Sequence, residues 1–272
     1  MTVARFDWGP LLKGGPLFIG ILNLTPDSFS DGGRFTHLEA ALAQARALTE
    51  AGAGMLDLGA ESTRPGATPL DAATEWARLE ATVDLLRSAL PDVPLSLDSR
   101  HAEVAARGLD AGIAALNDVT GFSDGAMLDL ARSSPCGLIA MRSRPAGAGF
   151  LMPPYDDPTP KDAATALKEL GAVRDRLGDA GLTPDRVLLD PGFGFGTTYL
   201  EDLALWQALP DLPRALDWPA DRVCIGISRK RFLAARAGTP MLSPAQRDDL
   251  TAAAHMEAQN CGYRVFRTHA IG

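Results

Sequence analysis

Residues 19–35 read IGILNLTPDSFSDGGRF, and this stretch gives the first indication of the architecture. Its beginning, 19–23, is apolar and predicts a buried strand that ends at an asparagine. The remainder is rich in Thr, Pro, Asp, Ser and Gly, which is typical of a loop. A buried strand that ends in a polar side chain and a long polar loop indicates the mouth of an α/β site. The alternative is a plain turn between a strand and a helix.

The same alternation of short apolar runs and Ala-rich helical stretches continues along the chain. Apolar residues at positions 38, 41, 42, 45 and 48 have the spacing of one buried helix face. Asp71 and Ser243 are placed to act as N-caps. We expect strands at 17–23, 55–60, 94–98, 114–119, 137–141, 187–190, 222–227 and 263–267, and helices at 37–51, 71–90, 101–111, 125–133, 161–180, 199–209 and 245–260. This count predicts a single α/β domain over residues 1–272 that forms a (β/α)8 TIM barrel, with an open doubly wound sheet as the alternative.

One feature departs from a complete barrel. Only residues 268–272 follow the last predicted strand, so the eighth outer helix is missing. Because the outer helices cover the strands, that face needs another cover. A truncated chain, a partner subunit or the N-terminal segment folded over this face would each explain the pattern.

Composition excludes several classes of protein. The net charge of −8 and the pI near 5.0 disfavour a nucleic-acid binder. The three cysteines are far apart and form no CxxC pair, which argues against a disulfide framework or a zinc site and suits a reducing cytoplasm. We find no signal peptide and no apolar run of membrane-spanning length, so we expect a cytoplasmic protein without membrane contact.

Polar side chains stand at nearly every predicted strand end. They are Asn23, Glu61-Ser62-Thr63-Arg64, Asp98, Asn117-Asp118, Arg142, Asp190, Ser228-Arg229-Lys230, Arg267 and His269. In a parallel barrel these ends meet at the face that carries the chemistry. One such residue is usually a cap or an ion-pair partner, but a converging set needs mutual partners or a ligand.

The chemistry of this set suits two kinds of group. Acceptors on Asp98, Asn117 and Asp190, with a cation at Lys230, match a flat heterocycle that has amino and ring N–H donors, such as a purine or a pterin. A buried Asp–Lys pair with a structural role is the alternative. Phosphate oxygens suit a second group, in which Arg64, Arg267 and His269 are or can be cationic and Thr63 adds a hydroxyl.

Other features are less specific. Asn23 offers a neutral oxygen that suits Mg²⁺ held through substrate phosphates, or it forms a turn. The glycine-rich run 192–196 lacks the spacing of a dinucleotide fingerprint, and we expect it to pack close to the site with Phe195 available for stacking. For Arg142 and Arg144 we favour a solvated loop over an anion site. We expect His255 on a helix surface.

These residues carry a family resemblance. The blocks that carry it, in order, are 19–35, DLGAESTRP at 57–65, Leu97-Asp98-Ser99, Asn117-Asp118, LDPGFGFG at 189–196, Ser228-Arg229-Lys230 and Arg267-Thr268-His269. Together they resemble the dihydropteroate synthases, from about residue 17 to the end of the chain. That family joins 6-hydroxymethyl-7,8-dihydropterin diphosphate to p-aminobenzoate in folate biosynthesis, releases diphosphate, and is the target of sulfonamides.

The resemblance implies a Mg²⁺-dependent homodimer whose partners are these two small-molecule substrates. By resemblance, the pterin is held by Asp98, Asn117, Asp190 and Lys230, with Arg64 nearby. The resemblance assigns the diphosphate to Asn23, which also meets Mg²⁺, and to Thr63, Arg267, Thr268 and His269. It assigns p-aminobenzoate to Phe29, Asp31, Thr63, Pro65, Phe195 and Arg231. The implied catalytic set is Asn23, Asp31, Arg64, Lys230, Arg267 and His269. The loops 25–35 and 62–69 would close over the pterin.

The chain departs from the family pattern in three places. Relatives often have Met-His-Met where this chain has Met141-Arg142-Ser143, and Asp where it has Ala270. The last helix, absent here, contributes to the dimer interface in the family. Two alternatives remain: a pterin-binding methyl-transfer domain, which has no need for the opening loop or for Arg267 and His269, and a non-catalytic relative that binds pterin or a partner.

Overall fold

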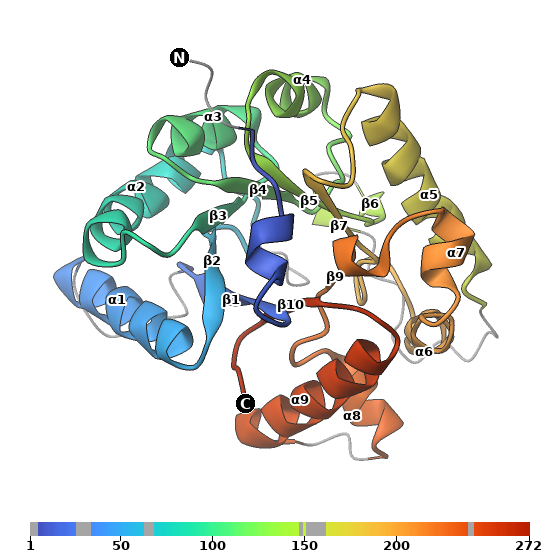
Figure 1. The fold of residues 1–272 in the computed structure, drawn as a ribbon. Helices are drawn as coiled ribbons and strands as arrows, with labels where there is room; N and C mark the ends of the chain where they lie inside the picture. Colours follow the sequence, from blue (N-terminus) through green and yellow to red (C-terminus); the bar gives the residue numbers. More distant parts are fainter. Residues whose placement is uncertain (1–4, 26–33, 63–67, 147–148, 151–161, 239–241) are drawn as a thin grey trace.

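Eight parallel strands form one sheet that closes into a barrel (Figure 1). The structure is a computed structural model that describes residues 5–25, 34–62, 68–146, 149–150, 162–238 and 242–272. In spatial order the strands are β8 (Val187–Asp190), β5 (Gly137–Met141), β4 (Ala115–Asp118), β3 (Leu95–Asp98), β2 (Ala53–Gly59), β1 (Leu17–Asn23), β10 (Val265–Thr268) and β9 (Cys224–Ile225). A parallel bridge between Leu189 and Val223 joins the two ends of this order. The predicted barrel is therefore confirmed, and the open sheet is wrong.

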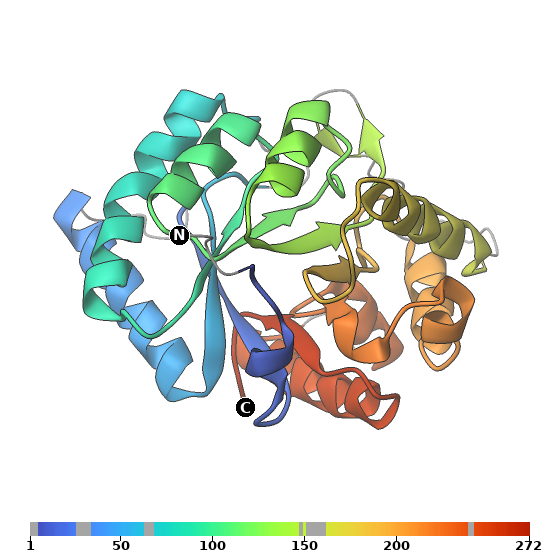
Figure 2. The ribbon, with the colours of Figure 1, turned by 45° about the horizontal axis from the view of Figure 1, so that its top comes forward.

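Helices surround the barrel on the outside (Figure 2). They are α1 (Arg34–Glu50), α2 (Ala72–Ala89), α3 (Ala102–Asp110), α4 (Gly125–Ser133), α5 (Ala164–Asp179), α6 (Tyr199–Gln207), α7 (Leu212–Leu216), α8 (Arg231–Arg236) and α9 (Pro244–Asn260). Shorter elements are the 3-10 turns η1 (Gly9–Leu12) and η3 (Ala220–Arg222) and the hairpin of β6 (Pro145–Ala146) and β7 (Gly149–Phe150). The Asp71 and Ser243 side chains accept hydrogen bonds from backbone N–H groups of α2 and α9, which confirms both predicted caps. Among the helices of the described ranges, none combines the length and apolar character that a membrane span requires.

Residues of each strand alternate between the barrel interior and the helices. The interior cluster consists of Leu17, Ile19, Met55, Ala115, Ile139, Leu188, Cys224 and Val265, together with Trp8 and Leu12. Residues of opposite parity, such as Leu22, Leu56 and Leu116, pack in the cluster shared with the helices. The barrel is thus a packed core, and one further inward position remains at the carboxyl end of most strands.

The N-terminal segment closes the opposite end of the barrel (Figure 1). Trp8 is fully buried and its Nε1 donates to the carbonyl oxygen of Arg186 at 2.8 Å. The backbone N–H groups of Phe6 and Trp8 donate to the carbonyl oxygens of Pro135 and Asp185, just before β5 and β8. The proposal that this segment replaces the eighth helix is therefore wrong.

The described residues after β10, from His269 to Gly272, contain no helix, and the chain ends between α1 and α9 (Figure 1). On this side the ring centroids of His255 and Phe266 lie 4.7 Å apart, and those of His255 and Phe18 lie 5.9 Å apart. His255 is only 4% exposed, so its predicted place on a helix surface is wrong. Its Nε2 has no hydrogen-bond partner among the described residues.

Candidate active site

The inward positions change from apolar to polar at the carboxyl end of the barrel. We call this set the polar layer, and it consists of Asn23, Asp57, Asp98, Asn117, Asp190 and Arg267. Two residues earlier, Met55, Ala115, Leu188 and Val265 belong to the apolar interior cluster. The same alternation that fills the barrel therefore turns these polar side chains toward one another.

Arg267 links two carboxylates within the polar layer. Its Nε lies 2.6 Å from Asp57 Oδ2 and its Nη2 lies 2.8 Å from Asp98 Oδ2. Asp57 Oδ2 also accepts from Asn117 Nδ2 at 2.9 Å, and Asp57 Oδ1 accepts from Ser96 Oγ at 2.5 Å. Strands β2, β3, β4 and β10 are thereby joined at their carboxyl ends by one charge-assisted network.

Asp57 was not singled out as a site residue in the sequence analysis, although it is fully buried at the centre of this network. A signal was present, because Asp57 is a charged residue inside an otherwise apolar strand. Its principal partner, Arg267, lies 210 positions away in the sequence. Local patterns contain no information about such a pair.

Two carboxylates of the polar layer have perturbed acidities. Burial raises the pKa of Asp98 to about 7, against the opposing attraction of the Arg267 guanidinium. Burial also raises the pKa of Asp190, although the Gly192 N–H donates to its Oδ1 at 2.7 Å. A Cβ on Gly226 would lie 2.8 Å from Asp190 Oδ2, so only glycine leaves room for this carboxylate. Both carboxylates are therefore poorly hydrated, so a hydrogen-bond donor on a ligand would interact with them strongly.

Lys230 is a cation of the barrel mouth, and it follows β9, which lies next to β8 and its Asp190. Its Nζ lies 4.2 Å from the centroid of the Phe195 ring. Burial lowers the pKa of Lys230 to about 8, while the carboxylates of Asp202 and Asp190 favour its charged form. The structure thus brings Lys230 and Asp190 to the same rim, as predicted from the strand ends, and it places Phe195 beside Lys230, as expected for the glycine-rich run.

His269 follows β10 directly. Its Nδ1 lies 3.0 Å from Ser228 Oγ, which also accepts from the His269 backbone N–H at 3.1 Å. Burial lowers the pKa of His269 to about 3, and the cations Arg229, Arg267 and Lys230 act in the same direction. The three cations would together attract an anionic group beside this imidazole. Thr268 is fully buried, and its hydroxyl donates to the carbonyl oxygen of Ala270 at 2.7 Å.

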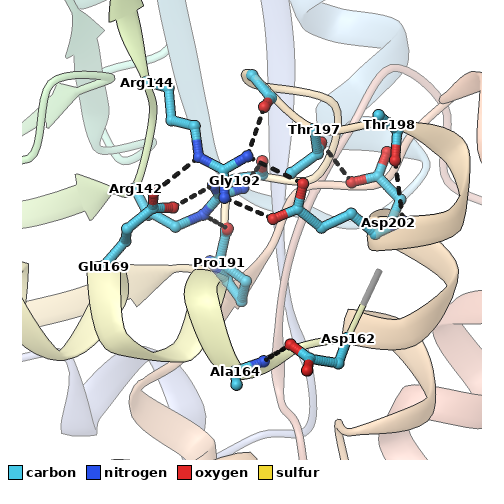
Figure 3. Close-up of polar contacts among 12 residues, drawn as sticks. Arg142, Arg144, Asp162, Ala164, Glu169, Pro191, Gly192, Thr197, Thr198 and Asp202 are labelled. Atoms are coloured by element: carbon cyan, nitrogen blue, oxygen red, sulfur yellow. Dashed lines mark hydrogen bonds and ion pairs between the residues drawn. The ribbon is translucent and has the colours of Figure 1, made fainter. Parts of the chain in front are cut away.

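The side chains of Arg142 and Arg144 lie neither in a solvated loop nor at an anion site, so both interpretations are wrong for these two residues (Figure 3). Arg142 is 1% exposed and donates to the carbonyl oxygens of Pro191 and Gly192 and to the carboxylate of Glu169. Arg144 bonds to Glu169 and Glu201. The two arginines therefore face protein groups rather than solvent or the barrel mouth.

Comparisons with known proteins agree with this geometry. Residues 19–269 match the family of pterin binding enzymes. The dihydropteroate synthase of Neisseria meningitidis serogroup C is 36% identical over 259 residues, which cover 94% of this chain and 88% of that protein. The chain belongs to the dihydropteroate synthase family.

Solved structures of the family show the same fold. The dihydropteroate synthase of Xanthomonas albilineans with 4-aminobenzoic acid has a TM-score of 0.81 and 35% identity, and the match covers 95% of this chain and 89% of that one. The enzyme of Anaplasma phagocytophilum with bound 6-hydroxymethylpterin-monophosphate has a TM-score of 0.79 and 32% identity, with 94% of each chain covered. Dihydropteroate synthases are transferases of folate biosynthesis, and this chain is one of them.

Several residues that the dihydropteroate synthase resemblance implies lie outside the described residues. They are Phe29, Asp31, Thr63, Arg64 and Pro65. Arg231 is described, and it lies at the start of α8 with an exposed side chain. Asn23 ends β1 half-buried at the rim. Within the described ranges, no cluster of three or more His, Cys, Asp or Glu side chains could hold a metal ion by itself.

Proposed function

We propose that the polar layer binds the pterin ring of 6-hydroxymethyl-7,8-dihydropterin diphosphate for condensation with p-aminobenzoate. The observation that carries this proposal is the convergence of Asp98, Asn117 and Asp190 on one inward face, with Lys230 at the same rim. A pterin presents an amino group and ring N–H groups along one edge and a carbonyl oxygen on another. Carboxylate and amide oxygens accept from the first edge, and the lysine or the Asn117 amide donates to the second.

The partly dry environment makes these contacts selective. Burial raises the pKa of Asp98 and Asp190, so each carboxylate has lost water that a ligand donor can replace. A ring that lacks those donors would leave the remaining acceptor positions of the two carboxylates unsatisfied, at a cost of about 1–3 kcal/mol each. This explains why the site would prefer a pterin over an apolar ring of the same size.

The diphosphate is proposed to lie above β10 and β1. Arg267 offers a guanidinium at the rim, and the cations that hold the pKa of His269 low would attract the same anion. The negative charge of two phosphate groups would raise the pKa of His269 and favour its protonated form, which could then donate a hydrogen bond to a phosphate oxygen. Thr268, whose hydroxyl is occupied by Ala270, would contribute by fixing the turn that carries His269. Thr63 is proposed for the same subsite from its place in the family motif.

The p-aminobenzoate is proposed to stack near Phe195, which already packs against Lys230 at the pterin rim. Arg231, or the start of α8, would face its carboxylate. The family motifs assign Phe29, Asp31 and Pro65 to this pocket and Arg64 to the adjoining pterin side. Together these positions would set the amine of p-aminobenzoate beside the exocyclic carbon of the pterin.

The residues present fit a Mg²⁺ ion that is bound chiefly through the substrate. Asn23 supplies a hard neutral oxygen at the end of β1, whereas the nearby Asp57 is already occupied by Arg267, Asn117 and Ser96. One or two protein oxygens, with phosphates and waters, form the usual environment of Mg²⁺ in such sites. When bound, the ion would offset charge on the diphosphate leaving group.

The chain's own part in the reaction is binding, orientation and charge stabilisation. The bond between the exocyclic carbon and the diphosphate oxygen breaks, the amine nitrogen forms a bond to that carbon, and the amine loses one proton. Arg267, His269 and Lys230 would stabilise the leaving charge, while Asp98 and Asp190 hold the electron-rich ring. No protein nucleophile is needed, since the two substrates supply both bonding partners.

We propose that the protein acts as a homodimer in the cytoplasm. The dimer rests on the family resemblance alone, and sedimentation velocity would test it. The compartment is supported by the three cysteines, all of which are free and two of which are buried.

The role of the polar layer is tested with Asp98→Asn. We expect this variant to bind 6-hydroxymethylpterin monophosphate about ten- to hundredfold more weakly, because a buried ring donor loses its charged acceptor. Asp129→Asn, in an exposed i,i+3 ion pair on α4, is the control and should bind like the unmodified protein. Equal affinity of the Asp98 variant and the control would remove Asp98 from the pterin site.

A further inference from the structure

We propose that Arg142 and Arg144 are positioning residues that set the loop 191–196, and through it Asp190 and Phe195, for pterin binding. This inference rests on the proposed role of the polar layer. The loop connects β8, which ends at Asp190, to the region just before α6. It therefore links one proposed pterin contact to the ring that packs against another, Lys230.

Arg142 holds the beginning of this loop by its backbone. Its Nε donates to the carbonyl oxygen of Pro191 at 2.7 Å and its Nη2 to that of Gly192 at 2.8 Å. The Gly192 N–H in turn donates to Asp190 Oδ1. Gly192 has a φ of +69°, and a Cβ there would lie 1.8 Å from the Arg142 carbonyl oxygen. The Arg142 guanidinium and the Asp190 carboxylate thus both form hydrogen bonds with the backbone of the same turn.

Arg144 holds the end of the loop. Its Nη1 donates to the carbonyl oxygen of Gly196 at 2.8 Å, and its guanidinium also pairs with Glu201 of α6. Glu169 of α5 lies between the two arginines and accepts from Arg142 Nη1 at 3.0 Å and from Arg144 Nε at 2.7 Å (Figure 3). We call this group, Arg142, Arg144, Glu169 and Glu201, the arginine clamp.

The middle of the loop is fixed by a separate set of bonds. The Gly194 N–H lies 3.0 Å from both Thr197 Oγ1 and Asp202 Oδ1, and Thr197 donates to the same carboxylate. Asp202 also favours the charged form of Lys230. Phe195 therefore sits on a loop that is held at both ends and at its centre, and it faces Lys230.

The arginine clamp could serve only to fold the loop, but its position beside Asp190 and Phe195 indicates that it also serves pterin binding. Carbonyl oxygens of a glycine-rich turn could be satisfied by water at far lower cost than a buried guanidinium. A charged group with three fixed bonds restricts the turn to one arrangement, which lowers the entropy lost when the ligand binds. The expected consequence of loosening it is weaker pterin binding rather than slower chemistry.

The chain offers a matched control at the other end of the barrel. Arg186 is also 1% exposed, and its guanidinium donates to the backbone carbonyl oxygens of Ala131, Ser134 and Cys136. Arg142→Lys and Arg186→Lys each keep a charge but leave several buried carbonyl oxygens without their donor. Both variants should lose stability, and only the first lies beside the polar layer.

For Arg142→Lys we expect the Kd of 6-hydroxymethylpterin monophosphate and the KM of the pterin diphosphate to rise about tenfold, with kcat nearly unchanged. Amide hydrogen exchange at 192–196 should accelerate in the same variant. Glu169→Gln keeps the shape of this partly exposed side chain, and it should shift both readouts in the same direction by less. Arg186→Lys should leave pterin affinity within about twofold of the unmodified enzyme and should not change exchange at 192–196.

Unchanged pterin affinity and loop exchange in Arg142→Lys would overturn the inference, as would an equal loss of affinity in Arg186→Lys. An unmodified chain that bound no pterin would instead refute the proposed function. The exchange comparison would then still decide whether Arg142 holds the loop.

Discussion

Asp57 is the anchor of the polar layer, and we predict that Asp57→Asn will impair both stability and catalysis. The carboxylate accepts three hydrogen bonds, from Arg267, Asn117 and Ser96, and it is fully buried. The substitution keeps the shape of the side chain and removes its charge. Arg267 retains Asp98 as a partner, so the guanidinium is not left entirely unpaired.

The magnitude follows from these contacts. A hydrogen bond to a charged group contributes about 1.5–3 kcal/mol, and the amide retains part of it, so we expect about 2 kcal/mol less stability. For a chain of 272 residues that corresponds to a Tm lower by roughly 3–4 °C. Because Arg267, Asn117 and Ser96 would share one uncharged amide oxygen in place of a carboxylate, kcat/KM for the pterin diphosphate should fall about tenfold or more.

The assays are urea unfolding and steady-state kinetics on the same preparations. Asp118→Asn provides the control, since Asp118 is equally buried but accepts from Thr120 and the Phe122 N–H outside the polar layer. It should lose stability and keep its kcat/KM per folded molecule. If Asp57→Asn lost stability without any loss of kcat/KM, the anchoring role assigned to Asp57 would be refuted.

Two further predictions concern packing and acidity. Gly226→Ala places a methyl group 2.8 Å from Asp190 Oδ2, so the affinity for the pterin, measured by titration, should fall about tenfold or more. Gly178→Ala on α5, which has open space around it, should bind the pterin normally. Equal affinities of the two variants would contradict the steric conflict between residue 226 and Asp190. Burial lowers the pKa of His255 to about 4, below its unfolded value near 6.5, so the unfolded chain binds more protons and stability is lost as pH falls from about 6.5 to 4. For His255 alone this loss amounts to about 2 kcal/mol at pH 5 and only about 0.2 kcal/mol at pH 7. His255→Phe should therefore remove about 2 kcal/mol of the destabilisation that urea unfolding detects between these pH values, and an unchanged pH dependence would argue against a neutral buried imidazole.

The barrel was predictable because its signals are local. Short apolar runs, helical spacing and the caps at Asp71 and Ser243 are all contained within a few consecutive residues. Parallel-barrel geometry then places the strand ends on one face, which is why Asp98, Asn117 and Arg267 can be grouped from the sequence alone.

The remainder depends on contacts between distant parts of the chain. Arg142 meets its carbonyl partners 49 and 50 positions later, so its sequence neighbourhood gave no reason to expect burial. Trp8 reaches Arg186 across 178 positions and closes the barrel end that sequence patterns left unassigned. His255 lies on a helix whose apolar periodicity is weak, and only the packing of Phe18 and Phe266 shows that it faces inward.

The proposed role of the polar layer is to perform the condensation. It is tested most directly by mixing the purified protein with the pterin diphosphate, p-aminobenzoate and Mg²⁺, and by measuring diphosphate release together with dihydropteroate formation. We predict equal amounts of both products, and release should require p-aminobenzoate. Tight pterin binding without either product would contradict this role and would instead identify a non-catalytic pterin-binding protein.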